Sequence, residues 1–411
     1  MKAKQSKKKR QGKVMAANKD KIIKTIYIIT LSILCAFGPL CTDIYLAALP
    51  QINDYFGTNA AQTQLTLTAC FLGLAFGQCV IGPISDARGR RIPLLGSMAV
   101  FTIMSFLCAV STDIRMLITA RFFQGFAGSG ALVLSRSIAC DKFQGPALTQ
   151  FMAVLMAINS VAPVLGPVIG SLIITVANWE AIFYLLAAIG VLVTILCLLF
   201  VGESHTPDPN SRGVFHAIAS MLKELLNLKF LFYVVSLSFI MGGFFGYISA
   251  APFVMQVHYH LSPLGFSGAF ATVTVCIAVA SMLAGRLVKR TGEVRMVWFS
   301  YVVMLIAGAG VLMISFFPPE SFIPILVCLM LFCSMMGVSQ TAGFSIVMAS
   351  RRGQAGAASG IFGVMTFLFG SLTSPFMGIK GENSIIPLGV CLTGCALMAM
   401  LFMRLADKMK K

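Results

Sequence analysis

Residues 60–111 read AAQTQLTLTACFLGLAFGQCVIGPISDARGRRIPLLGSMAVFTIMSFLCAVS, two apolar runs joined by a short charged loop. Each run, 60–83 and 92–111, is long enough to cross a bilayer core, which takes about 20 predominantly apolar residues. The loop holds three arginines and one acid beside glycines that permit a tight turn. The stretch therefore predicts two membrane helices whose charged connection lies at the membrane surface.

Ten more apolar runs of this kind lie on either side, so the chain is expected to cross the membrane twelve times as an all-α membrane protein. The other spans are predicted at 25–49, 115–138, 147–175, 179–201, 229–256, 264–288, 296–317, 321–347, 355–379 and 383–404. Composition agrees, because 58% of the 411 residues are hydrophobic and 11% are charged. Soluble proteins carry about 25% charged residues.

The net charge of +17 does not indicate a nucleic-acid partner, because the basic residues follow the breaks between spans. Ten of the 31 lysines and arginines lie in the first 24 residues. With twelve spans, one side of the membrane holds 27 of the 31. Short loops rich in Lys and Arg stay in the cytoplasm. We therefore expect a multi-pass protein of the inner (cytoplasmic) membrane, with the lipid bilayer as its environment and both termini in the cytoplasm.

The longest polar stretch divides the twelve spans into two sets of six. Within it, Val214 to Leu228 is predicted to form an amphipathic helix on the membrane surface. An internal repeat supports this division, because Gly82 and Gly89 in the first set match Gly285 and Gly292 in the second, seven apart in both. The predicted parts are a basic cytoplasmic N-tail (1–24), an N-terminal six-helix bundle (25–201), a cytoplasmic linker (202–228), a C-terminal six-helix bundle (229–405) and a cytoplasmic C-tail (406–411).

The sequence argues against an enzyme, a metal centre or a bound cofactor. Its twelve cysteines are scattered without a Cys-x-x-Cys pair, so we expect neither a disulfide framework nor a zinc site. A phosphate-binding Gly-x-x-x-x-Gly-Lys-Ser/Thr loop is missing, which argues against ATP as the energy source. Ser/His/Asp and Cys/His arrangements for nucleophilic catalysis are not evident either.

Several motifs together resemble the major facilitator superfamily. The loop Gly82 to Arg91 is similar to its best-known signature, and Arg121-Phe-Phe-Gln-Gly is similar to its Arg-x-x-Gln-Gly. The first span carries Thr42 to Pro50, TDIYLAALP, which resembles the Bcr/CflA-type drug-resistance exporters. Met241 to Pro252 resembles the chloramphenicol and florfenicol exporters of that group. The resemblance implies a major facilitator fold of two pseudo-symmetric six-helix bundles.

The loop after the second predicted span is expected to act as a charged gating latch. Its motif residues are Gly82, Asp86, Arg88, Gly89, Arg90 and Arg91. Asp86 can pair with an arginine or with a helix N-terminus. The family has arginine directly after this aspartate, whereas Ala87 stands here and Arg88 follows, so the partner of Asp86 stays open.

Asp43 is the predicted proton carrier, because a carboxylate in an apolar membrane segment is costly and usually functional. The alternative is an acid at the outer end of the span that faces water. Arg121 is expected at a similar depth on an opposite-running span, where it could pair with Asp43. By resemblance to the family, Arg121 takes part in proton coupling; a snorkelling anchor is the alternative.

The fifth predicted span carries an antiporter motif, formed by Pro163, Gly166, Pro167 and Gly170. Its prolines should bend the helix, and its glycines should form a flat face for a span of the other half. The substrate cavity is expected between the halves near the membrane midplane. Candidate lining residues, for which packing is the alternative, are Tyr45, Gln124, Phe239, Met241, Phe244, Phe245 and Tyr247.

These features predict a proton-coupled multidrug or phenicol-type exporter that works by alternating access. Its expected partners are protons and a small organic substrate, and we expect a monomer. The alternatives are an exporter of an endogenous metabolite or siderophore, and a proton-coupled nutrient importer. The antiporter motif separates export from import only through the family resemblance.

Overall fold

The computed structural model describes residues 25–206, 219, 223–350 and 355–409, and its regular structure in these ranges is helical. Helices suit a membrane because every backbone group bonds within its own segment. The first half forms a helix over Thr25–Cys35 and then α2 (Phe37–Asp43), η1 (Leu46–Ala48), α3 (Leu49–Phe56), α4 (Ala60–Arg88), α5 (Arg91–Ala109), α6 (Ile114–Lys142), α7 (Gly145–Val176) and α8 (Glu180–Phe200). The second half forms α10 (Leu228–Pro252), η2 (Phe253–His258), α11 (Pro263–Thr291), α12 (Glu293–Phe316), α13 (Ile323–Ala349), α14 (Ala355–Thr373), η3 (Pro375–Gly378) and α15 (Ile386–Lys408).

The predicted number of spans is confirmed when the bent first span is counted as one. Eleven helices in the described ranges are long and apolar enough to cross a membrane, and the pair Thr25–Cys35 and Phe37–Phe56 makes a twelfth. This pair is bent by 50°. Pro39 explains the bend, because it has no N–H to donate to the carbonyl of Cys35 one turn earlier.

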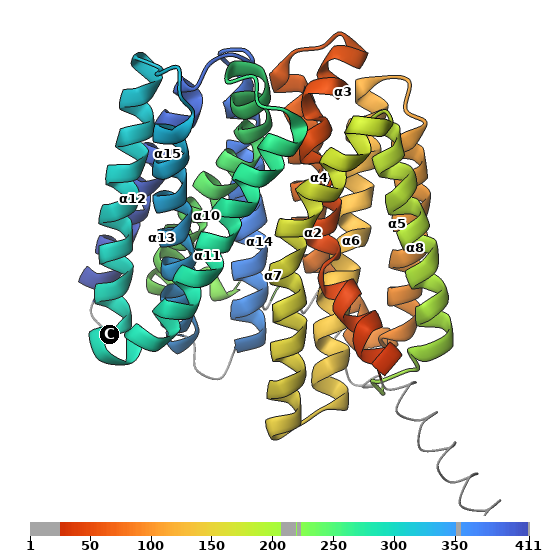
Figure 1. The fold of residues 1–411 in the computed structure, drawn as a ribbon. Helices are drawn as coiled ribbons and strands as arrows, with labels where there is room; N and C mark the ends of the chain where they lie inside the picture. Colours follow the sequence, from red (N-terminus) through yellow and green to blue (C-terminus); the bar gives the residue numbers. More distant parts are fainter. Residues whose placement is uncertain (1–24, 207–218, 220–222, 351–354, 410–411) are drawn as a thin grey trace, which may run out of the picture.

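Figure 1 shows the helices side by side, with α2 to α8 grouped on one side and α10 to α15 on the other. Both ends of the described chain lie at the same end of the bundle, as an even number of spans requires (Figure 1). The helices α4 and α14, and likewise α7 and α11, pack against each other across the two halves. The predicted boundaries of tails and linker stay a prediction, and most of the predicted linker helix lies outside the described residues.

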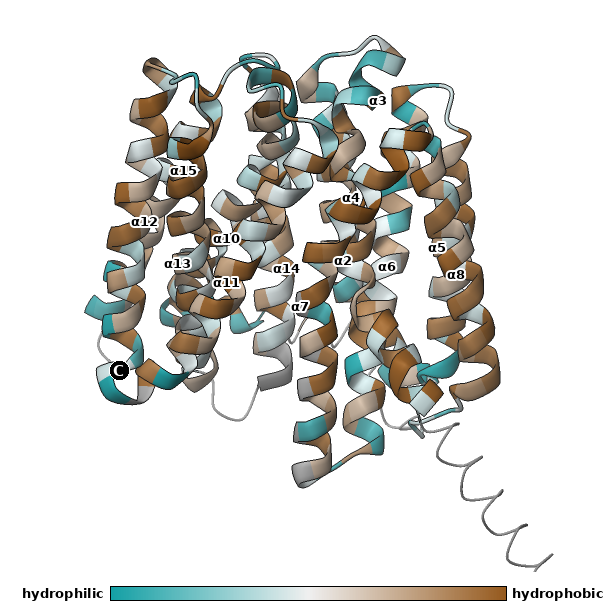
Figure 2. Ribbon diagram, viewed as in Figure 1, coloured by the Kyte–Doolittle hydropathy of each residue, from teal (hydrophilic) through white to brown (hydrophobic). Residues whose placement is uncertain are grey.

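The distribution of polar and apolar side chains is that of a protein surrounded by lipid. Figure 2 shows apolar residues along the outer faces of the helices. Leu199 and Phe299 are 70% and 63% exposed, whereas Arg121 and Gln124 are completely buried. Water could not stabilise this arrangement, because large apolar side chains would face it while ionisable ones are withdrawn. The functional site is therefore to be sought among buried polar groups.

Candidate functional site

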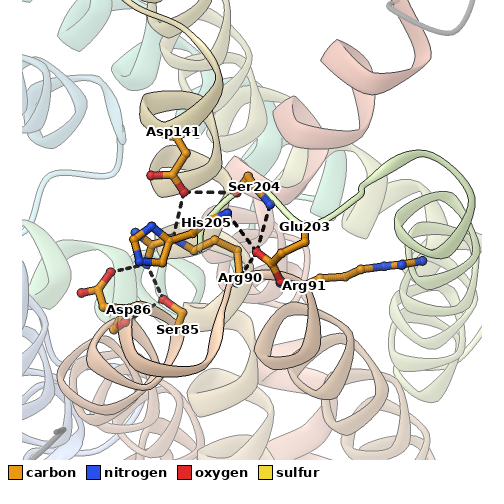
Figure 3. Close-up of polar contacts among 9 residues, drawn as sticks. Ser85, Asp86, Arg90, Arg91, Asp141, Glu203, Ser204 and His205 are labelled. Atoms are coloured by element: carbon orange, nitrogen blue, oxygen red, sulfur yellow. Dashed lines mark hydrogen bonds and ion pairs between the residues drawn. The ribbon is translucent and has the colours of Figure 1, made fainter. Parts of the chain in front are cut away.

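The charged loop between α4 and α5 is the centre of a polar network that we call the Arg90 cluster, made of Ser85, Asp86, Arg90, Asp141, Glu203 and Ser204 (Figure 3). The Arg90 guanidinium forms an ion pair with Asp86 and donates through Nε to Oδ2 of Asp141 at 3.0 Å. It also donates to the Ser85 hydroxyl at 2.7 Å. One buried guanidinium therefore ties the end of α4 to the end of α6.

Glu203, just after α8, joins this cluster through its carboxylate. It accepts backbone N–H bonds from Arg90 at 2.8 Å, Arg91 at 3.1 Å, Ser204 at 2.9 Å and His205 at 3.1 Å. Burial raises the pKa of Glu203, but the backbone N–H donors lower it more, so the net pKa lies below its ordinary value. The cluster thus keeps an ionised carboxylate against the start of α5.

Gly89 is required where this contact is made. Its φ of 89° lies in the left-handed region that favours glycine. A Cβ at this position would lie 2.6 Å from Oε2 of Glu203. Glycine thus allows both the turn and the close approach of the Glu203 carboxylate.

The structure answers the open question of the Asp86 partner. The partner is Arg90, one turn further along, rather than the exposed Arg88. Arg91 donates to the carbonyl oxygen of Leu198 on α8 at 3.1 Å. A Cβ on Gly82 would make only ordinary contact with Val133, at 3.7 Å, so close packing does not require that glycine.

Two members of the Arg90 cluster, Asp141 and Glu203, were missed by sequence reasoning. Asp141 falls in the break between the predicted spans 115–138 and 147–175, and Glu203 falls in the predicted linker 202–228, so neither was given a role. Both reach Arg90 through the packing of α6 and α8 against α5. The one available signal was the placement of two acids at predicted span ends facing the same surface as three arginines.

Asp43 lies at the end of α2, inside the N-terminal half, and is 4% exposed. Asp43 is therefore enclosed by protein in this conformation rather than facing water, and its role as the proton carrier stays a prediction. Its Oδ1 accepts a hydrogen bond from the Thr42 hydroxyl at 2.9 Å. The short helix η1 that follows Asp43 packs against α7 of the first half and against α10 and α11 of the second. Asp43 thus stands near the contact surface between the halves.

Arg121 on α6 is completely buried and is held by neutral groups. Its Nη1 donates to the carbonyl oxygen of Cys41 at 2.8 Å and to Oε1 of Gln124 at 2.6 Å. The guanidinium carbon lies 4.5 Å from the centroid of the Tyr45 ring, within range of a cation–π contact. Within the described structure, Nε and Nη2 of Arg121 have no hydrogen-bond partner.

The expected pair of Asp43 and Arg121 is not formed in this conformation. Arg121 instead binds the backbone of α2 two residues before Asp43, and the ion pairs of the described residues do not include one between the two. The two side chains do not contact each other, because Asp43 faces α7 while Arg121 approaches α2 from α6. The site therefore holds a buried acid and a buried base that are close but separate.

The antiporter motif of α7 packs on Asp43 itself. A Cβ on Gly166 would lie 2.9 Å from Cβ of Asp43, and one on Gly170 would lie 3.0 Å from the carbonyl carbon of Ile44. The prediction that these glycines face the other half is therefore wrong. They face α2 of their own half, because the break after Asp43 brings its backbone against α7. The helix continues through Pro163 and Pro167.

Contact between α7 and the other half is made instead by hydroxyl groups. Ser171 donates to the carbonyl oxygen of Pro263 at 2.7 Å, and Ser267 donates to that of Pro167 at 2.7 Å. The carbonyl of Pro167 thus takes part in the bond to α11. The motif therefore joins the Asp43 segment on one side to the second half on the other.

Two of the predicted cavity residues have a different place in the structure. Tyr45 and Gln124 are completely buried and support Arg121. The Tyr45 hydroxyl is hydrogen-bonded to that of Thr66 at 2.8 Å, and Gln124 donates to the Ser105 hydroxyl at 2.8 Å. Both are bonded within the first half, so they orient the guanidinium rather than line a cavity.

The five candidates on α10 divide into three half-buried and two buried side chains. Phe239, Met241 and Phe244 are half-buried. The Phe245 ring lies 4.5 Å from that of Phe71 in the first half, between centroids. Tyr247 is 1% exposed, and its hydroxyl has no hydrogen-bond partner in the described structure. Phe245 and Tyr247 are therefore at or near the contact between the halves.

Hydrogen bonds close the two halves together at the end opposite the termini, where α3 lies in Figure 1. Asn53 donates to Oε1 of Glu382 at 2.6 Å. Further bonds between the halves run from Gln64 to the carbonyl oxygen of Ser249 at 3.4 Å, from Gln256 to that of Ala47 at 3.3 Å, and from Ser374 to that of Gln64 at 3.4 Å. This end of the contact surface is therefore sealed by polar groups from both halves.

The chain is similar to known transporters along nearly its whole length. The family model for the Major Facilitator Superfamily matches residues 31–375. The Bacillus subtilis (strain 168) protein YdgK, described as an uncharacterized MFS-type transporter, is 35% identical over 364 residues, covering 87% of this chain and 90% of that one. A bicyclomycin resistance protein homolog of Haemophilus influenzae is 25% identical over 377 residues, covering 92% and 94%.

A solved structure has the same arrangement of helices. It is a bacterial homolog of the human lysosomal transporter Spinster, in an inward-facing and occupied conformation. The TM-score is 0.73 at 15% sequence identity, and the match covers 94% of this chain and 97% of that one. The likeness concerns the fold alone.

Proposed function

We propose that this chain, which belongs to the major facilitator superfamily, exports small organic compounds in exchange for protons by alternating access. We assign it to the cytoplasmic membrane with both termini in the cytoplasm, because 27 of its 31 basic residues lie on that side. The name of the bicyclomycin resistance homolog supports drug export as the activity.

The observation that carries the proposal is the buried position of Asp43. It is a carboxyl group almost without solvent contact, with one described hydrogen bond, packed beneath Gly166 of the antiporter motif. A group in such a place cannot exchange a proton with water until α2 and α7 move apart. Because α7 is also bonded to α11 of the second half, movement between the halves would move α7 relative to α2 and so control when Asp43 loads and releases its proton.

Arg121 would favour release of that proton in one conformation. Its guanidinium has two nitrogens without partners in the described structure and lies against the carbonyl of Cys41. A small rotation of α2 against α6 would bring the Asp43 carboxylate within reach, and the charged form of Asp43 would then be stabilised. The same rotation in reverse would favour the protonated form.

The substrate class we propose is neutral and partly aromatic, as in the phenicols. Besides Asp43, the acids that lie in the described spans are near helix ends, such as Asp86 and Asp141. The spans therefore offer no second buried carboxylate to attract a cation. The half-buried aromatic rings of α10, Phe239 and Phe244, would supply apolar contacts.

The test is a susceptibility panel in a bacterial host that lacks its own efflux pumps. The panel holds phenicols, bicyclomycin, cationic dyes and macrolides, and compares wild type with Asp43→Asn at matched membrane expression. We expect resistance to neutral compounds with wild type, and its fall to the background of the host with Asp43→Asn. Substrate-induced proton movement in membrane vesicles should disappear with it.

The matched control is Asp54→Asn, because Asp54 is an exposed acid on α3, in the same bent span. It should leave resistance unchanged. Full resistance and proton movement with Asp43→Asn would overturn the role of Asp43. Uptake of a nutrient without resistance to any compound would favour the import alternative.

A further inference from the structure

A groove on the lipid side of the C-terminal half has no role in the transport proposed above. It has a volume of about 620 Å³ and lies between α11 and α12, with α13 as its floor. Its apolar walls include Leu283 and Leu287 of α11 and Phe299 of α12, and its floor includes Met335 and Val338. The three wall residues are 48%, 48% and 63% exposed. The groove therefore opens to the surroundings of the bundle.

One end of this groove is basic. Arg290, Thr291 and Arg295 line it where α11 ends and α12 begins. Figure 2 shows hydrophilic residues at this junction, next to apolar faces of the two helices. Both arginines are exposed, and neither has an ion-pair partner among the described residues. Glu293, the acid nearest in sequence, lines a neighbouring hollow with Lys229 and Tyr233 instead.

An apolar groove with two arginines at one end complements the structure of a phospholipid. A row of apolar side chains about one leaflet deep can bury an acyl chain, and two guanidinium groups at the membrane surface can hold a phosphate. Arg295 lies in the first turn of α12, where the partial positive charge of the helix end adds to the attraction for an anion. A zwitterionic lipid would satisfy the same contacts less well, because its headgroup carries a compensating cation.

We propose that this groove binds an anionic phospholipid from the leaflet on the side of the chain termini. Its phosphate would lie between Arg290 and Arg295, and one acyl chain would lie against Leu283, Leu287 and Phe299. The site lies away from the bonds that join α7 to α11 and from Asp43. Its occupancy is therefore independent of the substrate.

The test measures lipid binding to the purified, delipidated full chain in detergent. Phosphatidylglycerol and phosphatidylcholine of equal chain length are titrated, and retention is followed by native mass spectrometry together with the shift of the unfolding temperature. We expect wild type to bind phosphatidylglycerol more tightly than phosphatidylcholine. Arg290→Gln with Arg295→Gln should weaken binding of phosphatidylglycerol by roughly 10- to 30-fold.

Two further variants separate this site from general attraction to basic surfaces. Arg404→Gln with Lys408→Gln removes two exposed charges at the end of α15, on the same side of the membrane, and should bind as wild type does. Ala280→Phe, on the groove wall, keeps all charges and should still weaken retention of the lipid by filling the space for its chain. Inorganic phosphate at the same concentration should not compete.

The proposal is overturned if the two lipids bind equally, or if both arginine pairs have the same effect. It is also overturned if the Ala280→Phe variant binds as wild type does, or if inorganic phosphate displaces the lipid. Each variant is first shown to elute as a single folded species, and loss of binding counts only with that condition met.

Discussion

Compared at matching positions of the internal repeat, Gly89 after α4 has φ 89° and ψ 163°, and Gly292 after α11 has φ 82° and ψ 147°. The backbone turn is thus the same in both halves. Around Gly89 the carboxylate of Glu203 fills the space beside the turn, whereas a Cβ on Gly292 would meet nothing within 4 Å. The same backbone turn therefore lies in two different environments, beside a carboxylate at Gly89 and in open space at Gly292.

The difference extends to the arginines of the two loops. Arg90 is 7% exposed and bonded to Asp86, Asp141 and Ser85, whereas Arg290 is exposed without an ion-pair partner in the described structure. The position that matches Asp86 holds Lys289 in the second copy, and the position that matches Arg90 holds Glu293, so the pairing of the first loop has no counterpart there. Arg90 of the first loop is paired within the protein, whereas Arg290 of the second loop is exposed and has no ion-pair partner among the described residues.

Replacement of the two arginines should therefore have unequal effects on stability. Arg90→Gln leaves Asp86 and Asp141 without their shared cation, and we expect a cost of about 2 kcal/mol or more. At this chain length that lowers the apparent unfolding temperature by about 2–3 °C. Arg290→Gln should change it by less than about 1 °C, because exposed substitutions are close to neutral.

Thermal unfolding in lipid-free detergent, followed by fluorescence, measures both variants against wild type. Phospholipid must be removed because it would add its own stabilisation to the second loop. Equal losses in the two variants would show that the Arg90 cluster contributes no more than an exposed charge does, and the comparison of the loops would fail.

The helical spans were predictable from the sequence because hydropathy decides them, whereas their arrangement as a major facilitator fold was implied by the motif resemblance. Runs of about 20 apolar residues must be helices in lipid, whatever their neighbours. The bend in the first span was not predicted, although Pro39 lies within that span. The apolar run continues through this proline, so hydropathy gave no sign of a break.

The sequence identified single residues of the candidate site but not the contacts between them. Asp43 and Arg121 stand out as charges in apolar segments, and both are buried. Their partners depend on how helices are rotated against one another, which a sequence does not specify. The partners of Arg90 and the packing of Gly166 on Asp43 therefore had to come from the structure.

The two glycines offer a second, smaller test of the comparison. Alanine at either position is strained by about 1–2 kcal/mol, because a positive φ disfavours a side chain. Gly89→Ala must also displace the Glu203 carboxylate, since its Cβ would lie 2.6 Å from Oε2. We expect it to lower the apparent unfolding temperature by about 1–2 °C more than Gly292→Ala does. Similar losses would mean that the carboxylate moves aside without cost.

The smallest expected effect concerns Glu203, and it depends on pH. The pKa of Glu203 is lowered in the folded chain, so its stabilising contribution is present above the ordinary pKa of about 4.3 and is lost as pH falls through the lower folded value. Glu203→Gln keeps one acceptor oxygen but loses the charge. Because Glu203 is exposed, we expect the variant to lose only about 1 °C of apparent unfolding temperature at pH 7.

That difference should shrink as pH falls from about 4.3 through the lower folded pKa of Glu203, since wild-type Glu203 then becomes neutral as well. Glu382→Gln is the matched control. The Glu382 carboxylate accepts a hydrogen bond from the Asn53 side chain, whereas the Glu203 carboxylate accepts four bonds from backbone N–H groups. Unfolding temperatures at several pH values separate the two. A difference that stayed constant with pH would mean that Glu203 acts through its shape, and the first loop would then depend on Arg90 alone for its charge.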